Sequence, residues 1–183
     1  MVRIILRGVI ILFWVVVFLA WPNRATASPF GQGIFGADVP FGSATSMSIA
    51  LGGNVSLPLT SNGSNFVGSG SHSVTVTSTD VVGYRLYVNA TSATNMVNGS
   101  ATITASANGT ASPLTASTWG YNTTGSTTNF LGLPVGGALL KNASGPFKNG
   151  DTTTITYGAL TSLTQPAGTY TIAITYTTVA TNP

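Results

Sequence analysis

The chain has 183 residues and little charge: six are Lys or Arg, three are Asp, one is His, and Glu and Cys are absent. Arg3, Arg7 and Arg24 lie in the first 27 positions, so the rest of the chain has three basic and three acidic side chains and is neutral. Nucleic-acid binding requires clustered Lys and Arg that neutralise phosphates, so this partner class is excluded. Without Cys the chain has no disulfide, thiol nucleophile or Cys-ligated zinc.

Residues 1–27 have the three parts of a secretory signal: basic Arg3 and Arg7, an apolar run over residues 8–21, and Ala-Thr-Ala at 25–27. We expect cleavage before Ser28 and export through the general secretory route to the cell surface or exterior. The alternative is that the segment is not cleaved and anchors the chain in the membrane. We expect no other membrane contact. Fourteen helical residues span about 21 Å, however, which is less than a hydrocarbon core of about 30 Å.

Residues 28–45 are predicted to form an extended N-terminal arm or an edge strand. The segment is rich in Gly and contains two Pro residues, and spaced apolar side chains of this kind suit donation into the sheet of a neighbouring molecule. The candidate donor residues are Phe30, Ile34, Phe35, Val39 and Phe41.

The next segments alternate apolar and polar residues, which is typical of strands. Residues 47–51 and 55–59 are predicted to form a hairpin around Gly-Gly-Asn, followed by a polar loop over residues 60–70. Residues 73–79 and 82–90 are the next strands; in the second, Tyr84, Leu86 and Val88 share one face.

In the second half, residues 101–105 and 114–121 are short strand candidates, and residues 131–141 read as an irregular crossing segment that ends in a strand. Residues 152–157 and 169–179 are predicted to pair as a closing hairpin, because Pro-Ala-Gly between them suits a reversal.

These segments amount to about eight short strands, and no helical period persists beyond residue 27. They predict an all-β fold: a single antiparallel β-sandwich of about 7–9 strands over residues 46–183, with an immunoglobulin-like or jelly-roll-like Greek key. The closing strand is expected to lie centrally in its sheet. Its core face is expected to consist of Tyr170, Ile172, Ile174 and Tyr176.

His72 is expected to be an exposed loop residue. A Ser-His-Asp triad would need Asp80 or Asp151 beside it, and the sequence around His72 lacks the strand–turn–helix context of a nucleophile elbow. One His and three scattered Asp residues also lack the spacing of a zinc or calcium site. No catalytic, cofactor-binding or metal-binding residue is therefore predicted.

Two further features suggest chemistry. Lys141 precedes Asn142, and some surface adhesins contain intramolecular Lys–Asn crosslinks, but these need a neighbouring acid and the chain has no Glu to supply it. Trp119 with Tyr121 and Asn122 suggests an aromatic platform for a sugar ring, although a single Trp in a sandwich is more often a core anchor, which is the interpretation that we favour.

Three stretches resemble exported β-sandwich proteins of bacterial cell surfaces: Gly-Tyr-Arg-Leu at 83–86, Trp-Gly-Tyr at 119–121, and Pro-Ala-Gly-Thr-Tyr at 166–170 with Ile-Thr-Tyr at 174–176. In particular they resemble the WxL-domain cell-surface proteins of Gram-positive bacteria and their shorter relatives in candidate-phyla bacteria such as Saccharibacteria.

The resemblance covers residues 34–183, and it implies a place at the cell wall. The two Trp-x-Leu motifs that are associated with wall attachment in that family would fall at residues 84–86 and 176–178. This sequence has Tyr-Arg-Leu and Tyr-Thr-Thr there.

The expected function is non-enzymatic: a structural or adhesive role at the cell envelope. The expected partner is an envelope component, another surface protein or a second copy of the chain. One alternative is a pilin-like or filament subunit that polymerises by strand donation from residues 30–41. Another is a carbohydrate-binding or cell-wall-binding module. Its contacts would be Trp119, Tyr121, Asn122, Tyr84 and Tyr176.

Overall fold

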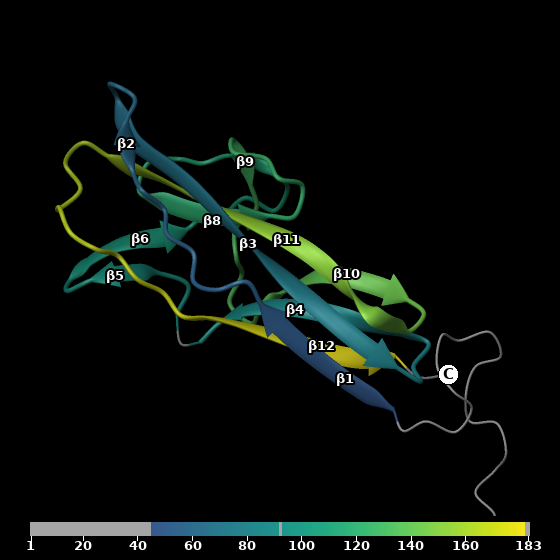
Figure 1. The fold of residues 1–183 in the computed structure, drawn as a ribbon. Helices are drawn as coiled ribbons and strands as arrows, with labels where there is room; N and C mark the ends of the chain where they lie inside the picture. The colour runs from purple at the N-terminus through teal and green to yellow at the C-terminus, as the bar shows by residue number, and fades with distance from the viewer. Residues whose placement is uncertain (1–44, 92, 182–183) are drawn as a thin grey trace, which may run out of the picture. The chain divides into compact units, whose positions relative to one another are not determined.

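The structure is a computed structural model that describes residues 45–91 and 93–181 (Figure 1). The predicted signal segment and almost all of the predicted arm, including its five donor residues, lie outside the described residues. Within the described part the chain forms strands and no helix. The strands are β1 (Ser46–Leu51), β2 (Thr60–Ser61), β3 (Asn65–Thr79), β4 (Gly83–Ala90), β5 (Met96–Asn98), β6 (Ala101–Ala105), β7 (Ser112–Pro113), β8 (Thr118–Asn122), β9 (Asn129–Phe130), β10 (Ala138–Ser144), β11 (Phe147–Ser162) and β12 (Ile174–Thr181).

The larger sheet has seven strands in the order β1-β3-β11-β8-β6-β5, with β2 also paired to β3. Its two long strands, β3 and β11, run antiparallel side by side (Figure 1). The β6–β8 pair is parallel, whereas the other pairs of this sheet are antiparallel.

A second sheet has three antiparallel strands in the order β10-β4-β12, and β7 and β9 form a two-stranded sheet. On β4 the predicted face of Tyr84, Leu86 and Val88 is fully buried. These side chains belong to one hydrophobic cluster with Val74 and Ile155 of the larger sheet. Two sheets with a shared core are a β-sandwich type of fold, so the predicted fold class is confirmed.

The predicted closing hairpin is wrong. β11 pairs with β3 and β8 in the larger sheet, whereas β12 pairs with β4 in the other sheet. Residues 163–173 cross between the two sheets. The expected core face of the closing strand is confirmed, since its four apolar side chains are partly buried against the core. Its expected central position is wrong, because β12 is the outer strand of its sheet as described and β4 is the central one.

The predicted first hairpin is also wrong. β1 forms as expected but pairs with the far half of β3, and residues 55–59 form no strand. Gly68 and Gly70 of β3 explain the difference: a Cβ atom at either position would collide with the backbone oxygen of Pro58 or Ser56. The two glycines thus let the backbone of residues 56–58 lie directly against β3. β3 starts at Asn65, so most of the predicted loop over residues 60–70 is strand.

Candidate functional site

Two groups of polar side chains connect the larger sheet to the three-stranded sheet. The tyrosine–histidine cluster consists of His72 on β3, Tyr157 on β11 and Tyr176 on β12. The lysine–aspartate cluster is Lys141 on β10, Asp151 on β11 and Tyr84 on β4. Each cluster joins residues from both sheets. Three residues that the sequence suggested for catalysis or crosslinking, His72, Lys141 and Asp151, belong to these clusters.

The tyrosine–histidine cluster is a directed chain of hydrogen bonds. His72 Nδ1 lies 2.9 Å from the Gly53 carbonyl oxygen, which can only accept. In a neutral imidazole Nδ1 therefore carries the hydrogen, and Nε2 accepts from the Tyr176 hydroxyl at 2.6 Å. Tyr176 has then used its hydrogen, so Tyr157 donates to it at 2.5 Å. Both ring nitrogens of His72 and the hydroxyl oxygens of Tyr176 and Tyr157 therefore each have a hydrogen-bond partner.

Burial strengthens this arrangement. Desolvation raises the pKa of Tyr157 above its usual value, and the neighbouring Tyr176, which accepts its hydrogen, raises it further. Desolvation also raises the pKa of Tyr176, although the hydrogen bond from Tyr157 partly offsets this. Both hydroxyls therefore stay protonated at neutral pH and serve as donors in the chain.

His72 was predicted to be an exposed loop residue, and this is wrong. It lies within β3, partly buried, and its ring packs 5.3 Å from the Tyr176 ring. Both ring nitrogens are engaged by Gly53 and Tyr176. Asp80 instead accepts from the Thr45 hydroxyl, and Asp151 belongs to the other cluster, so the hypothetical triad partners lie elsewhere.

The lysine–aspartate cluster centres on one carboxylate. Lys141 Nζ lies 2.6 Å from Asp151 Oδ1, and the Tyr84 hydroxyl donates to Oδ2 at 2.7 Å. Tyr84 is fully buried, with the Phe147 ring edge-on at 5.6 Å. Desolvation raises the pKa of Tyr84, and the hydrogen bond to Asp151 raises it further. The hydroxyl therefore remains a donor to the carboxylate.

The proposed sugar platform does not form. A sugar ring needs an exposed aromatic face, but Trp119 is fully buried and Tyr121, Asn122 and Tyr84 are nearly or fully buried as well. Trp119 donates its indole N–H to the Thr94 carbonyl at 2.8 Å, which confirms its interpretation as a core anchor. The amide of Asn122 donates to the Ser126 and Asn129 carbonyls and so fixes its own loop. Tyr176 is partly exposed, but its hydroxyl belongs to the tyrosine–histidine cluster.

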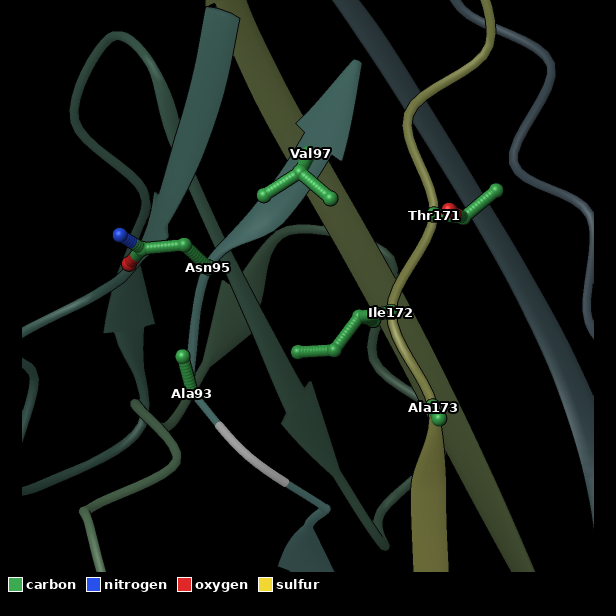
Figure 2. A pocket seen from close by; sticks show the side chains of 6 residues that line it. All are labelled: Ala93, Asn95, Val97, Thr171, Ile172 and Ala173. Atoms are coloured by element: carbon green, nitrogen blue, oxygen red, sulfur yellow. The ribbon is translucent and has the colours of Figure 1, made fainter. Parts of the chain in front are cut away.

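A shallow depression of about 220 Å³ lies between two crossing segments; Figure 2 shows its lining, Ala93, Asn95, Val97, Thr171, Ile172 and Ala173. The backbones of Val97 and Thr171 exchange hydrogen bonds of 2.9 and 3.0 Å across it. Its lining residues are uncharged, so they offer a ligand shape but little electrostatic attraction. Across residues 45–91 and 93–181 no three His or Asp side chains gather where they could hold a metal ion. The same ranges contain no helix that could span a bilayer.

The two segments that correspond to the Trp-x-Leu motifs lie on neighbouring strands. Tyr176 on β12 is opposite Val88 on β4, and Thr178 is opposite Leu86. Sequence alternation predicted that these strands have core faces, but it did not predict that they pair.

The fold and the two clusters define the class: an all-β domain of β-sandwich type whose sheets are joined by buried, hydrogen-bonded tyrosines. Comparisons of the chain with protein-family models, with curated proteins and with solved structures found no match. The likeness to WxL-domain proteins therefore stays a prediction.

Proposed function

We propose that the protein is a non-enzymatic, exported module with a structural or adhesive role at the cell envelope. One observation carries the proposal: His72 and Asp151, the groups best suited to chemistry, act as connections between the two sheets. A catalytic group needs an open position for its substrate, whereas both nitrogens of His72 and both oxygens of Asp151 have protein partners. Such side chains serve the cohesion of the sandwich.

The outer faces fit the same role. Hydroxyl side chains pair across strands, as between Thr75 on β3 and Thr152 on β11 at 2.8 Å, and between Ser46 on β1 and Thr79 on β3 at 2.8 Å. A surface of short hydroxyl side chains with little charge offers hydrogen bonds without strong attraction for ions. It suits contact with polysaccharide-rich or protein-rich envelope material. The predicted export signal over residues 1–27 supports the location.

The test is fractionation of the native host, followed by a pull-down of the purified full chain on cell wall from that host. We expect the chain in the surface or extracellular fraction and retention on the wall or on a surface protein. A cytoplasmic location would overturn the proposal. Secretion without retention on any envelope fraction would overturn the adhesive role.

A second candidate is a filament subunit that donates residues 30–41 to a neighbour. The observation in its favour is the position of β1: among the described strands it pairs only with β3, so it lies at the end of the larger sheet. Two of its apolar side chains, Ile49 and Leu51, are exposed. An edge of this kind can accept another strand. Size-exclusion chromatography and negative-stain images, with and without residues 28–45, test it; a monomer in both samples contradicts polymerisation.

A further inference from the structure

Two backbone irregularities turn Lys141 and Asp151 toward each other. On β10, Leu139 lies opposite Tyr87 and Lys141 lies opposite Leu86, so Leu140 is an extra residue in the pairing with β4. In a regular strand successive side chains point to opposite faces, so Lys141 would point outward if Leu140 pointed toward the core. Because of the bulge, the side chains of Leu140 and Lys141 are both partly buried. The bulge therefore directs the Lys141 amine into the space between the sheets.

The second irregularity is on β11. Phe147 lies opposite Ser78 and Asp151 opposite Val76, so residues 148–150 oppose the single Thr77 of β3. Gly150 has a φ of 87°, a left-handed conformation that favours glycine at a bulge. Regular pairing resumes at Asp151, which is directly opposite Val76 on β3. Val76 is fully buried, so Asp151 lies on the core face of the sheet. Bulges often re-aim a side chain next to a reactive site, and here two of them act on one pair.

The surroundings of the pair bring a third polar group to the same carboxylate. The side chains are 32% (Lys141) and 16% (Asp151) exposed, so both lie partly between the sheets. The Tyr84 hydroxyl donates to Oδ2, the oxygen that the amine does not contact. A nucleophile, a carboxyl group and a donor to its second oxygen thus meet at one point, on three different strands.

We propose that Lys141 and Asp151 form an intramolecular amide (isopeptide) crosslink between β10 and β11. This inference goes beyond the proposed function and does not depend on it. Asn142 was the crosslink partner that the sequence suggested for Lys141, but its side chain is exposed on β10. The structure therefore assigns the bond to Asp151 instead.

The reaction balances without a co-reactant. A proton passes from the Lys141 ammonium to Asp151 Oδ1 along the 2.6 Å contact, which gives a neutral amine and a carboxylic acid. The Nζ lone pair then forms a bond to Cγ, and the π electrons of the carbonyl move to Oδ2, where the Tyr84 hydroxyl stabilises the oxyanion. A second proton passes from Nζ to Oδ1, the Cγ–Oδ1 bond breaks, and one water leaves. Fixed proximity lowers the barrier to this reaction, because the two groups do not have to meet by diffusion.

The test uses trypsin and mass spectrometry on the full chain, sampled over time after its synthesis. Trypsin cuts after Arg85, Lys141 and Lys148, so an unlinked chain releases fragments 86–141, 142–148 and 149–183. The crosslink blocks cleavage at Lys141 and joins fragment 86–148 to 149–183, with a mass lower than their sum by one water. All of these fragments lie beyond residue 85, so processing of the N-terminus does not affect the result.

Three variants sharpen the test. Lys141→Arg keeps the positive charge but removes the nucleophilic amine, and we expect only unlinked fragments. Asn142→Ala is the matched control and is expected to crosslink fully. Tyr84→Phe preserves the packing of the ring and removes the oxyanion donor, so we expect formation that is slower by on the order of 100-fold. Separate fragments from the long-incubated wild-type chain, or joined fragments from Lys141→Arg, would overturn the crosslink. An unchanged rate in Tyr84→Phe would overturn the assigned role of Tyr84.

Discussion

The Tyr176 hydroxyl lies 2.6 Å from His72 Nε2, although 104 positions separate the two residues and their strands belong to different sheets. Tyr157 extends the contact, so β3, β11 and β12 meet through three side chains. A buried hydroxyl without a partner costs free energy, and the chain of bonds forms completely only when the sheets are correctly placed. The tyrosine–histidine cluster therefore selects one arrangement of the sandwich.

We expect Tyr176→Phe to lower the free energy of unfolding by about 1–3 kcal/mol, because it leaves both the Tyr157 hydroxyl and His72 Nε2 without their partner. Urea unfolding followed by circular dichroism measures this change. Tyr87→Phe is the matched control, since Tyr87 is on the opposite face of β4, and its effect is expected to stay within about 0.5 kcal/mol. Equal effects of the two substitutions would contradict the importance of the cluster.

Alkaline pH is expected to unfold the protein. The pKa of Tyr84, Tyr121, Tyr157 and Tyr176 is raised in the folded state above the ordinary value of about 10, chiefly by desolvation. Between the unfolded and the folded pKa the unfolded chain binds fewer protons, so stability is fully present below about pH 10 and falls as the pH rises further.

Urea midpoints between about pH 8 and pH 11 test this, together with the ultraviolet absorbance of tyrosinate. We expect these four hydroxyls to ionise only as the chain unfolds. Their ionisation near pH 10 in a chain that keeps its native near-ultraviolet circular dichroism would contradict their burial.

Trp119→Ala is expected to destabilise the fold by about 3–5 kcal/mol, since it removes a fully buried ring and leaves the Thr94 carbonyl without its donor. Chemical denaturation measures the loss. Val135→Ala, at a residue that is 90% exposed, is the control and is expected to change stability by less than about 0.5 kcal/mol. A Trp119→Ala chain of normal stability that no longer binds its cell wall would instead support the sugar platform.

Gly158→Ala is expected to lower the free energy of unfolding by about 1–3 kcal/mol, because the added Cβ would collide with the Phe130 ring against which β11 packs. Gly109→Ala is the matched control: a Cβ there meets open space, so no loss of stability is expected. Thermal unfolding of the two variants compares them directly. A Gly158→Ala chain as stable as Gly109→Ala would mean that β11 and Phe130 are not in close contact.

The strand β4 shows what alternation in the sequence can predict. Tyr84, Leu86 and Val88 were placed on one face by their spacing, and all three are fully buried. The same reasoning found β1, β6 and the core face of the closing strand, because a strand with one buried side must place apolar residues at every second position. It missed the first half of β3, where Gly, Ser and Asn give no strand signal and pairing with β11 imposes the extended conformation.

The candidate site was much less predictable. Asp151 entered the sequence analysis only as a possible partner of His72, and Lys141 only beside its neighbour Asn142. Nothing local in the sequence shows that two bulges direct the Lys141 and Asp151 side chains toward each other. The signal available was Gly150, a glycine just before the acid inside a strand run, which is typical of a bulge.

By itself, the sequence determined the all-β class, the alternating core faces and the low charge, since these depend on residues near one another in the chain. Only the tertiary structure decided that β11 and β12 belong to opposite sheets, that His72 meets Tyr176, and that Lys141 meets Asp151. The physical reason is that strand alternation specifies which side of a strand is buried but not which strand lies across from it. That choice depends on packing and hydrogen bonding between residues far apart in the chain.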